Sequence, residues 1–214
     1  MKTDPSQFVR ANTDVMTPPH VPEVRLHLAS EAHDLWLKTE EELDEIGLPP
    51  PFWAFAWAGG QGLARYVLDH PTTVAGKKVL DFASGSGLVA IAASKAGAAS
   101  VMAADIDPWA QTAIALNAAE NVAEIGFIGD NLVGTDLRTD VLLAGDVFYD
   151  RAFAEMLVPW FVALCEKGVT VMVGDPGRAY LPKERLELLA TYQVPVTRAL
   201  EDSDVKKTTV WRFI

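Results

Sequence analysis

The sequence VLDFASGSGLVAIAASKAGAASVMAADID, residues 79–107, has two apolar segments that each end in an aspartate. A glycine-containing turn and a run of small residues lie between them, which predicts a strand, a helix and a second strand. Gly85 and Gly87 allow the backbone to approach a ligand closely, because any Cβ there would intrude. Asp105, at the end of the second strand, is placed to accept hydrogen bonds from ribose hydroxyls. The unit therefore predicts a bound nucleoside.

The turn between the first strand and the helix, DFASGSG at residues 81–87, favours one kind of nucleoside. A dinucleotide site uses a G-x-G-x-x-G sequence so that a pyrophosphate sits on bare backbone N–H groups. Here Asp81 comes first, and its carboxylate would repel a pyrophosphate but attract a cation. S-adenosylmethionine carries an ammonium group beside its sulfonium. The charge of the turn therefore favours S-adenosylmethionine over NAD as the cofactor.

The size and charge of the chain limit the number of domains and the kind of partner. It has 214 residues, half of them hydrophobic, and a formal net charge of −11. This length can bury one substantial core, so we expect one α/β domain at residues 51–214 after an N-terminal extension at residues 1–50. The negative charge argues against a nucleic-acid partner, since phosphates would be repelled. It suits a basic partner such as a lysine-bearing protein surface, although an acidic surface serves solubility equally well.

The cysteine and histidine content limits the chemistry further. Cys165 is the only cysteine, so no intrachain disulfide is possible, a reducing compartment is expected, and the thiol is interpreted as packed core. The four histidines are scattered without metal-ligand spacing, and no metal is predicted. No signal peptide, transit peptide or membrane span is evident, so we expect a cytoplasmic protein without a membrane partner.

The rest of the chain continues the alternation of strands and helices. A flexible start over residues 1–20 is expected to lead into a short strand at Val24–Leu28 and an acidic, partly helical segment at Asp34–Ile46. Later helices are predicted from near Gly60 to before Pro71, and at Pro108–Asn121, Arg151–Glu166 and Leu181–Leu189. Later strands are predicted at Ile125–Ile128, Val141–Ala144, Val169–Val173, Val194–Arg198 and Thr208–Phe213.

This alternation predicts the α/β class: a Rossmann-like, mostly parallel seven-stranded sheet covered on both faces, with the last two strands as an antiparallel edge hairpin. Such a succession resembles the class I, or seven-β-strand, methyltransferase fold. GDVFYD, residues 145–150, follows the fourth predicted strand. Ligands in such sheets bind beyond the carboxyl ends of the strands, so Asp146 and Tyr149 are expected at the mouth where the methyl group is transferred. Asp146 also has a plainer interpretation as a helix cap.

Five blocks between about Pro51 and Phe213 carry a more specific resemblance. They are PFWAFAWAGGQGLARYVL, ADIDPWA, GDVFYD, VGDPGRAYL and TTVWRF. Together they resemble the D-x-x-Y protein-lysine methyltransferases that modify the β-subunit of electron-transfer flavoprotein. The resemblance implies an S-adenosylmethionine-dependent protein-lysine N-methyltransferase whose protein substrate is that flavoprotein subunit.

The resemblance also implies roles for individual residues. Asp146 and Tyr149 would act at the catalytic position. The methionine end of the cofactor would lie on the acidic turn, the ribose on Asp105 and the adenine beside Ile106, and Trp57 and Trp53 would close over the cofactor and the lysine channel. The implied cofactor-binding residues are Trp57, Asp81, Ala83, Gly85, Gly87, Asp105, Ile106 and Asp130 or Asn131. The implied substrate-binding residues are Trp53, Phe148, Asp175 and Arg178.

The chemistry of methyl transfer suggests what Asp146 does. Transfer from a sulfonium is an in-line displacement, so the enzyme must hold the amine and the methyl carbon on one axis. A protonated lysine has no lone pair, and its amine, with a reference pKa of about 10.4, must first lose a proton. A carboxylate favours the ammonium form. Our hypothesis is that Asp146 captures and orients the lysine, and that the proton leaves through water.

Several alternatives stay open at this point. Ala83 stands where the family usually has glycine, and Trp53 and Trp57 are also interpretable as aromatic core anchors. GDPGR, residues 174–178, is equally well interpreted as a plain Pro-Gly turn. Methyltransferases of glutamine or adenine amino groups would be expected to carry Asn/Asp-Pro-Pro-Tyr, which this chain lacks. The remaining alternatives are lysine methylation of another protein, such as a ribosomal protein, and a non-catalytic nucleoside-binding module.

Overall fold

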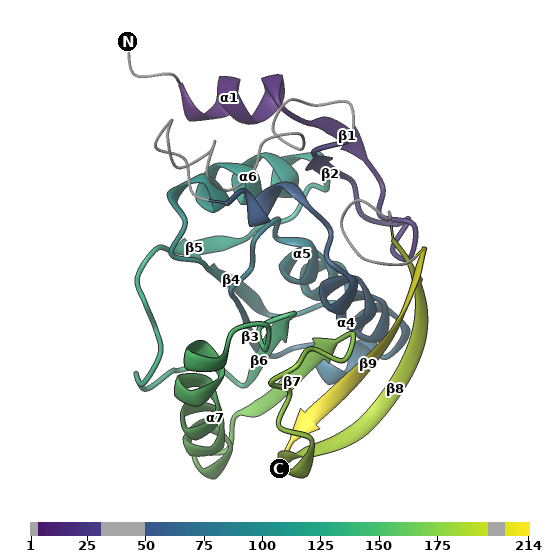
Figure 1. Cartoon of the computed structure of the whole chain (residues 1–214). Coiled ribbons are helices and arrows are strands. Elements are labelled where there is room, and N and C mark those ends of the chain that lie inside the picture. Colours follow the sequence, from purple (N-terminus) through teal and green to yellow (C-terminus); the bar gives the residue numbers. More distant parts are fainter. Residues whose placement is uncertain (1–3, 31–49, 197–203) are drawn as a thin grey trace.

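The computed structural model describes residues 4–30, 50–196 and 204–214, and a seven-stranded sheet forms its centre (Figure 1). The strand order is β5-β4-β3-β6-β7-β9-β8. The strands are β3 (Lys78–Phe82), β4 (Ser100–Ala104), β5 (Gly126–Ile128), β6 (Val141–Gly145), β7 (Thr170–Asp175), β8 (Leu186–Pro195) and β9 (Val205–Phe213).

The sheet is parallel from β5 to β7, and β9 is antiparallel to both β7 and β8. The expected mostly parallel sheet with an antiparallel edge hairpin is therefore confirmed. The chain builds outward from β3 through β4 to β5 and then returns to place β6 on the other side of β3. In open α/β sheets, ligands bind beyond the carboxyl ends of the strands at such a reversal of order. The topology thus points to the ends of β3 and β6.

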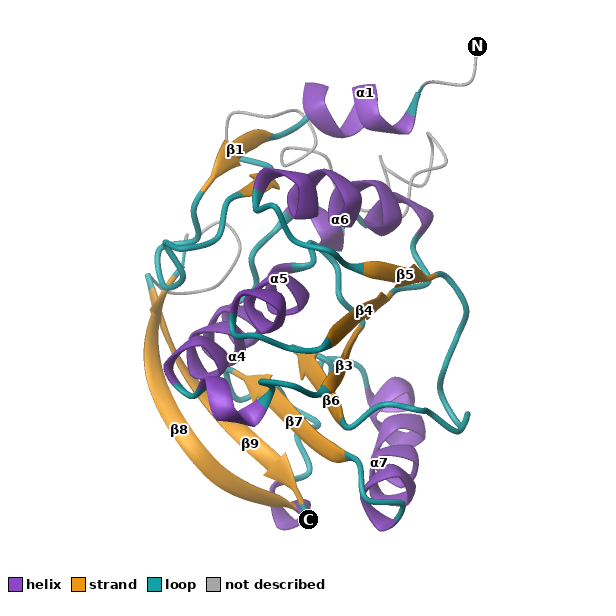
Figure 2. Ribbon diagram, turned by 180° about the vertical axis from the view of Figure 1, so that it is seen from behind, coloured by secondary structure: helices purple, strands orange, loops and turns teal. Residues whose placement is uncertain are grey.

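Helices cover both faces of the sheet, as the view from behind shows (Figure 2). One face carries α4 (Ala58–Asp69), α5 (Leu88–Lys95) and α6 (Pro108–Glu120), and the other carries α7 (Arg151–Glu166). Strand side chains alternate between the two cores. Val79 and Leu143 belong to the core beneath α4 and α5, and Leu80 and Leu142 belong to the core beneath α7. Because both faces are buried, the central strands are apolar along their length.

Residues 4–30 form α1 (Pro5–Ala11) and a two-stranded antiparallel sheet of β1 (Asp14–Met16) and β2 (Leu26–Leu28). The short strand predicted here is confirmed as β2. The prediction of a flexible start is wrong from residue 4 onward, because α1 begins at Pro5. The side chain of Asp4 accepts a hydrogen bond from the backbone N–H of Ser6 and caps α1. The predicted segment Asp34–Ile46 lies outside the described residues.

The N-terminal elements dock on α6. The ring of Phe8 in α1 lies 4.4 Å, centroid to centroid, from the ring of Trp109 in α6. The backbone N–H of His27 in β2 donates to the side chain of Asn117, at 2.7 Å. The apolar and polar contacts together explain why this polar segment is ordered.

The helix predicted at Leu181–Leu189 is wrong. A single 3-10 turn at Lys183–Arg185 leads into β8, which pairs with β9 from Leu186, opposite Phe213, to the far end of the hairpin. A short L-E-L-L pattern fits either a helix or a strand, and the long partner strand decides between them. The first two residues of the strand predicted at Val194–Arg198 are the end of β8, and its last two residues lie outside the described residues.

In the described ranges, every helix is too short or too polar to span a membrane. No group of three or more histidine, cysteine, aspartate or glutamate side chains there is arranged to hold a metal ion.

Candidate functional site

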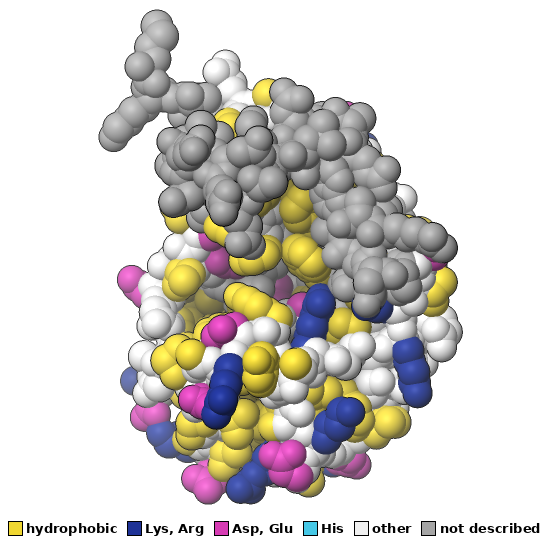
Figure 3. Space-filling view, viewed as in Figure 1, with side chains coloured by type: hydrophobic (Ala, Val, Ile, Leu, Met, Phe, Trp, Pro, Cys, Tyr) yellow, Lys and Arg dark blue, Asp and Glu magenta, His cyan; other side chains and the backbone are white. Residues whose placement is uncertain are grey.

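A pocket of about 700 Å³ lies at the carboxyl ends of β3, β4 and β6. Figure 3 shows the molecule hollowed on this face, with apolar side chains around the opening. Its floor and walls come from segments far apart in the sequence. The lining includes Phe52, Trp53, Trp57, Gly60, Asp81, Ala83, Gly85, Leu88, Asp105, Ile106, Asp146, Tyr149, Phe153 and Arg178.

The acidic turn forms one end of this pocket. Ala83 and Gly85 have φ of 52° and 53°, and Gly87 has φ of 80°. The left-handed region costs a residue with a Cβ about 1–2 kcal/mol. Ala83 therefore adopts the glycine-like conformation at a cost in backbone strain.

Two strand-end carboxylates hold the turn. Asp81 accepts hydrogen bonds from the Ser84 hydroxyl at 2.5 Å and from the Ala90 backbone N–H at 3.0 Å. Asp105 accepts from the backbone N–H of Gly85 at 2.8 Å and of Asp107 at 3.0 Å. The carboxylates thus fix the backbone of the turn and of the segment that follows β4.

The pKa values of the same two carboxylates are shifted by their burial. Burial raises the pKa of Asp81 to about 7, against hydrogen bonds from Ser84 and Ala90 that lower it. Burial also raises the pKa of Asp105. A cation bound here would favour the ionised carboxylates. This donor set fits S-adenosylmethionine, whose ammonium group suits Asp81 and whose ribose hydroxyls suit the free lone pairs of Asp105.

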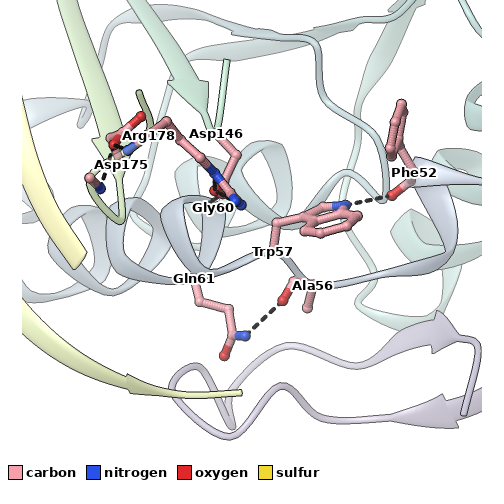
Figure 4. Close-up of polar contacts among 9 residues, drawn as sticks. Phe52, Ala56, Trp57, Gly60, Gln61, Asp146, Asp175 and Arg178 are labelled. Carbon is pink, nitrogen blue, oxygen red and sulfur yellow. Dashed lines mark hydrogen bonds and ion pairs between the residues drawn. The ribbon is translucent and has the colours of Figure 1, made fainter. Parts of the chain in front are cut away.

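Asp146 lies at the other end of the pocket (Figure 4). One carboxylate oxygen accepts from the Arg178 guanidinium, with Nη2 at 2.8 Å and Nε at 3.2 Å. The other accepts from the backbone N–H of Gly60, at 3.0 Å. Burial raises the pKa of Asp146 to about 6, although the Arg178 charge acts in the opposite direction. Asp146 also has φ of 57°, so the strand-end backbone is strained where it presents this carboxylate.

Arg178 is held from three sides. Its backbone N–H donates to Asp175 at 2.7 Å, in the turn that follows β7. Its guanidinium carbon lies 6.0 Å from the centroid of the Trp57 ring, which is the range of a cation–π contact. The Trp57 indole N–H in turn donates to the backbone oxygen of Phe52, at 3.1 Å. Figure 4 shows Arg178 and Asp146 pointing toward one another at the start of α4, with Trp57 nearby.

Aromatic side chains surround the mouth. The Tyr149 side chain is 54% exposed, and its ring centroid lies 6.0 Å from that of Phe52 and 6.3 Å from that of Phe153. Partial burial and the nearby charges of Asp150 and Asp105 raise the pKa of Tyr149. Trp53 lines the pocket although it is almost fully buried. Trp53 is therefore both a core anchor and a wall of the pocket.

Five residues named from the sequence lie outside this lining. Phe148 is fully buried in the core beneath α7, against Phe161 and Phe213. Phe148 lies in the turn that follows β6, where its side chain packs into this core and does not line the pocket. Asp175 is buried behind Arg178 and acts through the turn. The other three are Gly87, which caps α5, and the exposed pair Asp130 and Asn131 beyond β5.

Several residues of the pocket are not among those predicted from the sequence. Gly60 donates to Asp146, and Phe52 and Phe153 form part of the aromatic rim. The signal for Gly60 was present in the sequence, since two adjacent glycines at the start of a helix indicate close contact with another segment. The aromatic rim had no comparable signal.

Comparisons with known proteins identify the family of the chain. A family model described as Ribosomal protein L11 methyltransferase (PrmA) matches residues 66–167. The chain is 37% identical to the electron transfer flavoprotein beta subunit lysine methyltransferase of Xenopus laevis, over 99% of this chain and 87% of that protein. The Homo sapiens protein of the same name is 35% identical, over 96% of this chain and 80% of the relative.

Solved structures show the same fold. A ribosomal protein L11 methylase from Lactobacillus delbrueckii subsp. bulgaricus has a TM-score of 0.51 and 23% identity, over 73% of this chain and 79% of that chain. The magnesium protoporphyrin IX methyltransferase (ChlM) from Synechocystis PCC 6803 with bound SAM has a TM-score of 0.52 and 13% identity, over 87% of this chain and all of that chain. The chain is therefore an S-adenosylmethionine-dependent methyltransferase and belongs to the family of electron transfer flavoprotein beta subunit lysine methyltransferases.

Proposed function

We propose that this protein transfers methyl groups from S-adenosylmethionine to lysine side chains of the β-subunit of electron-transfer flavoprotein. One observation carries the proposal: a single pocket joins the acidic turn that suits the methyl donor to the Asp146, Arg178 and Trp57 cluster. The names of the relatives, which match over nearly the whole chain, supply the substrate. The bound cofactor would supply an electrophilic methyl group on a sulfonium, and the protein would supply position and charge.

At the end of the pocket that contains the acidic turn, each residue would bind one part of the cofactor. Asp81 would hold the ammonium group, and Gly85 would let the backbone approach the methionine end. Asp105 would accept the ribose hydroxyls, since a carboxylate has about four lone-pair sites, more than its backbone N–H partners occupy. Ile106 would lie against the adenine, and Asp130 or Asn131 would reach it only if the exposed segment beyond β5 moves toward the pocket.

At the other end of the pocket, Asp146 and the aromatic side chains of the rim would orient the substrate lysine. The lysine side chain has an apolar stem and a charged tip, and aromatic walls suit the stem. Trp57, Phe52 and Tyr149 provide such walls beside the carboxylate of Asp146. This arrangement would place the amine on one axis with the methyl carbon.

The proposal is tested by incubating the protein with labelled S-adenosylmethionine and purified electron-transfer flavoprotein, followed by mass spectrometry of the peptides. We expect label on lysines of the β-subunit. Flavoprotein whose lysines have been chemically blocked is the control and should stay unlabelled. Parallel reactions contain ribosomal protein L11, which the family model at residues 66–167 makes the second candidate, and total RNA. Label on L11 or RNA, with none on the flavoprotein, would contradict the proposal.

A further inference from the structure

The Asp146 carboxylate is already paired with a cation of the same chain. Two nitrogens of Arg178 donate to one of its oxygens, and the Gly60 backbone N–H donates to the other. The guanidinium also lies against the Trp57 ring. A carboxylate beside an aromatic face is the kind of site that binds an ammonium ion, and here the chain's own arginine contacts both.

Charged and titratable side chains at the ends of the neighbouring strands surround the Asp146–Arg178 pair. Asp81 and Asp105 stand at the ends of β3 and β4, and Asp175 at the end of β7 lies behind Arg178. Tyr149 follows β6, and the Gly60 N–H in the first turn of α4 points at Asp146. Among the described residues of the lining, Arg178 is the one cationic side chain, against four aspartates. Its removal would leave the acceptor carboxylate without a balancing cation.

We propose that Arg178 balances the charge of Asp146, so that the substrate lysine reaches the methyl donor as a neutral amine. This inference rests on the proposed function. A lysine beside an unbalanced carboxylate keeps its proton, because the ion pair stabilises the ammonium form. With Arg178 in place, the carboxylate orients the amine without an excess of negative charge. The ammonium gives its proton to solvent water. The lone pair of the resulting neutral amine then forms the N–C bond as the S–C bond breaks, and the sulfur keeps that bonding pair.

Arg178 is thus a positioning and charge-balancing residue, and the pH dependence of the reaction tests it. Single-turnover methylation of the flavoprotein subunit is measured against pH for the wild-type protein and for Arg178→Gln, Arg178→Lys and Arg212→Gln. Arg212 forms an ion pair with Glu187 on the outer strands, so its loss controls for net charge. Thermal melting and calorimetry with S-adenosylmethionine check the fold and the cofactor site of each variant.

We expect the rate profile of Arg178→Gln to move by about one pH unit to the alkaline side. Its rate would then be about tenfold below the wild-type rate at neutral pH, and the two would converge at high pH. Arg178→Lys should keep the wild-type profile at a lower rate, because it restores the charge but not the fork geometry. Arg212→Gln should match the wild type.

The outcomes separate this inference from the proposed function. An Arg178→Gln protein that is folded and slower by the same factor at every pH would overturn charge balance and leave a purely structural role. If that variant does not fold, Asp146→Asn gives the mirror test, since the unbalanced Arg178 should then move the profile to the acid side. A profile that stays in place would again overturn the inference. Wild-type protein that does not methylate the flavoprotein contradicts the proposed function itself.

Discussion

At the scale of the residue, Asp146 illustrates how the fold selects between two interpretations of a strand-end aspartate. The cap of α7 is Asp150, whose carboxylate accepts from the backbone N–H of Phe153 at 2.8 Å. Asp146 is therefore not needed to start the helix that follows it. Its carboxylate instead turns into the pocket, where it accepts from Gly60 and Arg178. The helix-cap interpretation therefore applies to Asp150 and not to Asp146.

Replacement of Asp146 by asparagine tests its orienting role. The amide keeps the shape but loses the charge, and a misplaced amine costs about 100-fold in rate. We expect Asp146→Asn to lower turnover on the protein substrate by about that factor while S-adenosylmethionine binding persists. Asp150→Asn is the matched control, since asparagine also caps helices. Normal turnover of Asp146→Asn at saturating substrate would rule out the role.

Asp81 makes the affinity for the cofactor depend on pH. Its pKa of about 7 in the folded protein exceeds the unfolded value, so between about pH 4 and 7 the unfolded chain ionises first and Asp81 progressively lowers stability as the pH rises. An ammonium ligand binds the ionised form, so we expect binding of S-adenosylmethionine to strengthen from about pH 5.5 to 7, where the ligand amine stays protonated.

Calorimetry in buffers of different ionisation enthalpy measures this affinity and the proton released on binding. Asp81→Asn should bind more weakly and lose most of the slope with pH. Asp136→Asn, which removes an exposed carboxylate that pairs with Lys167, is the control and should keep the slope. A wild-type affinity that does not change over this range would contradict the role of Asp81.

At the scale of the element, α4 reaches the sheet through glycines. A Cβ on Gly59 would lie 2.3 Å from the backbone oxygen of Gly174 and 2.5 Å from the carboxylate of Asp146. A Cβ on Gly60 would have only Val89 near it, at 3.9 Å. The two adjacent glycines therefore differ in purpose. Gly59 allows the helix N-terminus to contact β7, which brings the Gly60 N–H to Asp146.

Alanine at each position tests this difference. We expect Gly59→Ala to lower the free energy of unfolding by about 1–3 kcal/mol, because it overpacks a backbone contact, and to displace Asp146. Gly60→Ala should raise it by up to about 1 kcal/mol, because alanine is the better helix former and the space is open. Chemical denaturation measures both variants. Equal stability of the two proteins would disprove the close-approach argument.

At the scale of the whole molecule, Asn117 of α6 connects the N-terminal hairpin to the cofactor turn. Its fully buried side chain accepts from the backbone N–H of His27 at 2.7 Å and donates to the backbone oxygen of Ser86 at 2.8 Å. The side-chain amide of Asn117 thus links His27 and Ser86, which are distant from each other in the sequence. The N-terminal elements consequently support the turn on which the cofactor would lie.

We expect Asn117→Leu to destabilise the fold by about 2–4 kcal/mol, since two buried backbone groups lose their partner, and to weaken S-adenosylmethionine binding. Asn121→Leu is the matched control on the same helix. Asn121 bonds to Arg25 of the N-terminal segment but not to the cofactor turn. Its loss should lower stability and leave cofactor affinity unchanged. Unchanged affinity in Asn117→Leu would show that the hairpin and the turn are independent.

The sequence by itself determined the elements of the parallel sheet and the residues at its carboxyl edge. Each central strand is a short, mostly apolar run with an aspartate or glycine at or next to its carboxyl end, and this local signal needs no partner. Asp81, Gly85, Asp105 and Asp146 were named for the same reason. The sequence also flagged Ala83, but only the backbone shows that alanine takes the left-handed conformation.

Only the tertiary structure decided what depends on contacts between distant segments. β8 is a strand because β9 pairs with it, and Phe148 leaves the pocket because its side chain falls on the α7 face of the sheet. The pairing of Arg178 with Asp146 joins two turns that lie 32 residues apart. Local patterns fix which face of a segment is apolar, whereas the charge that meets Asp146 depends on the packing of β6, β7 and α4 together.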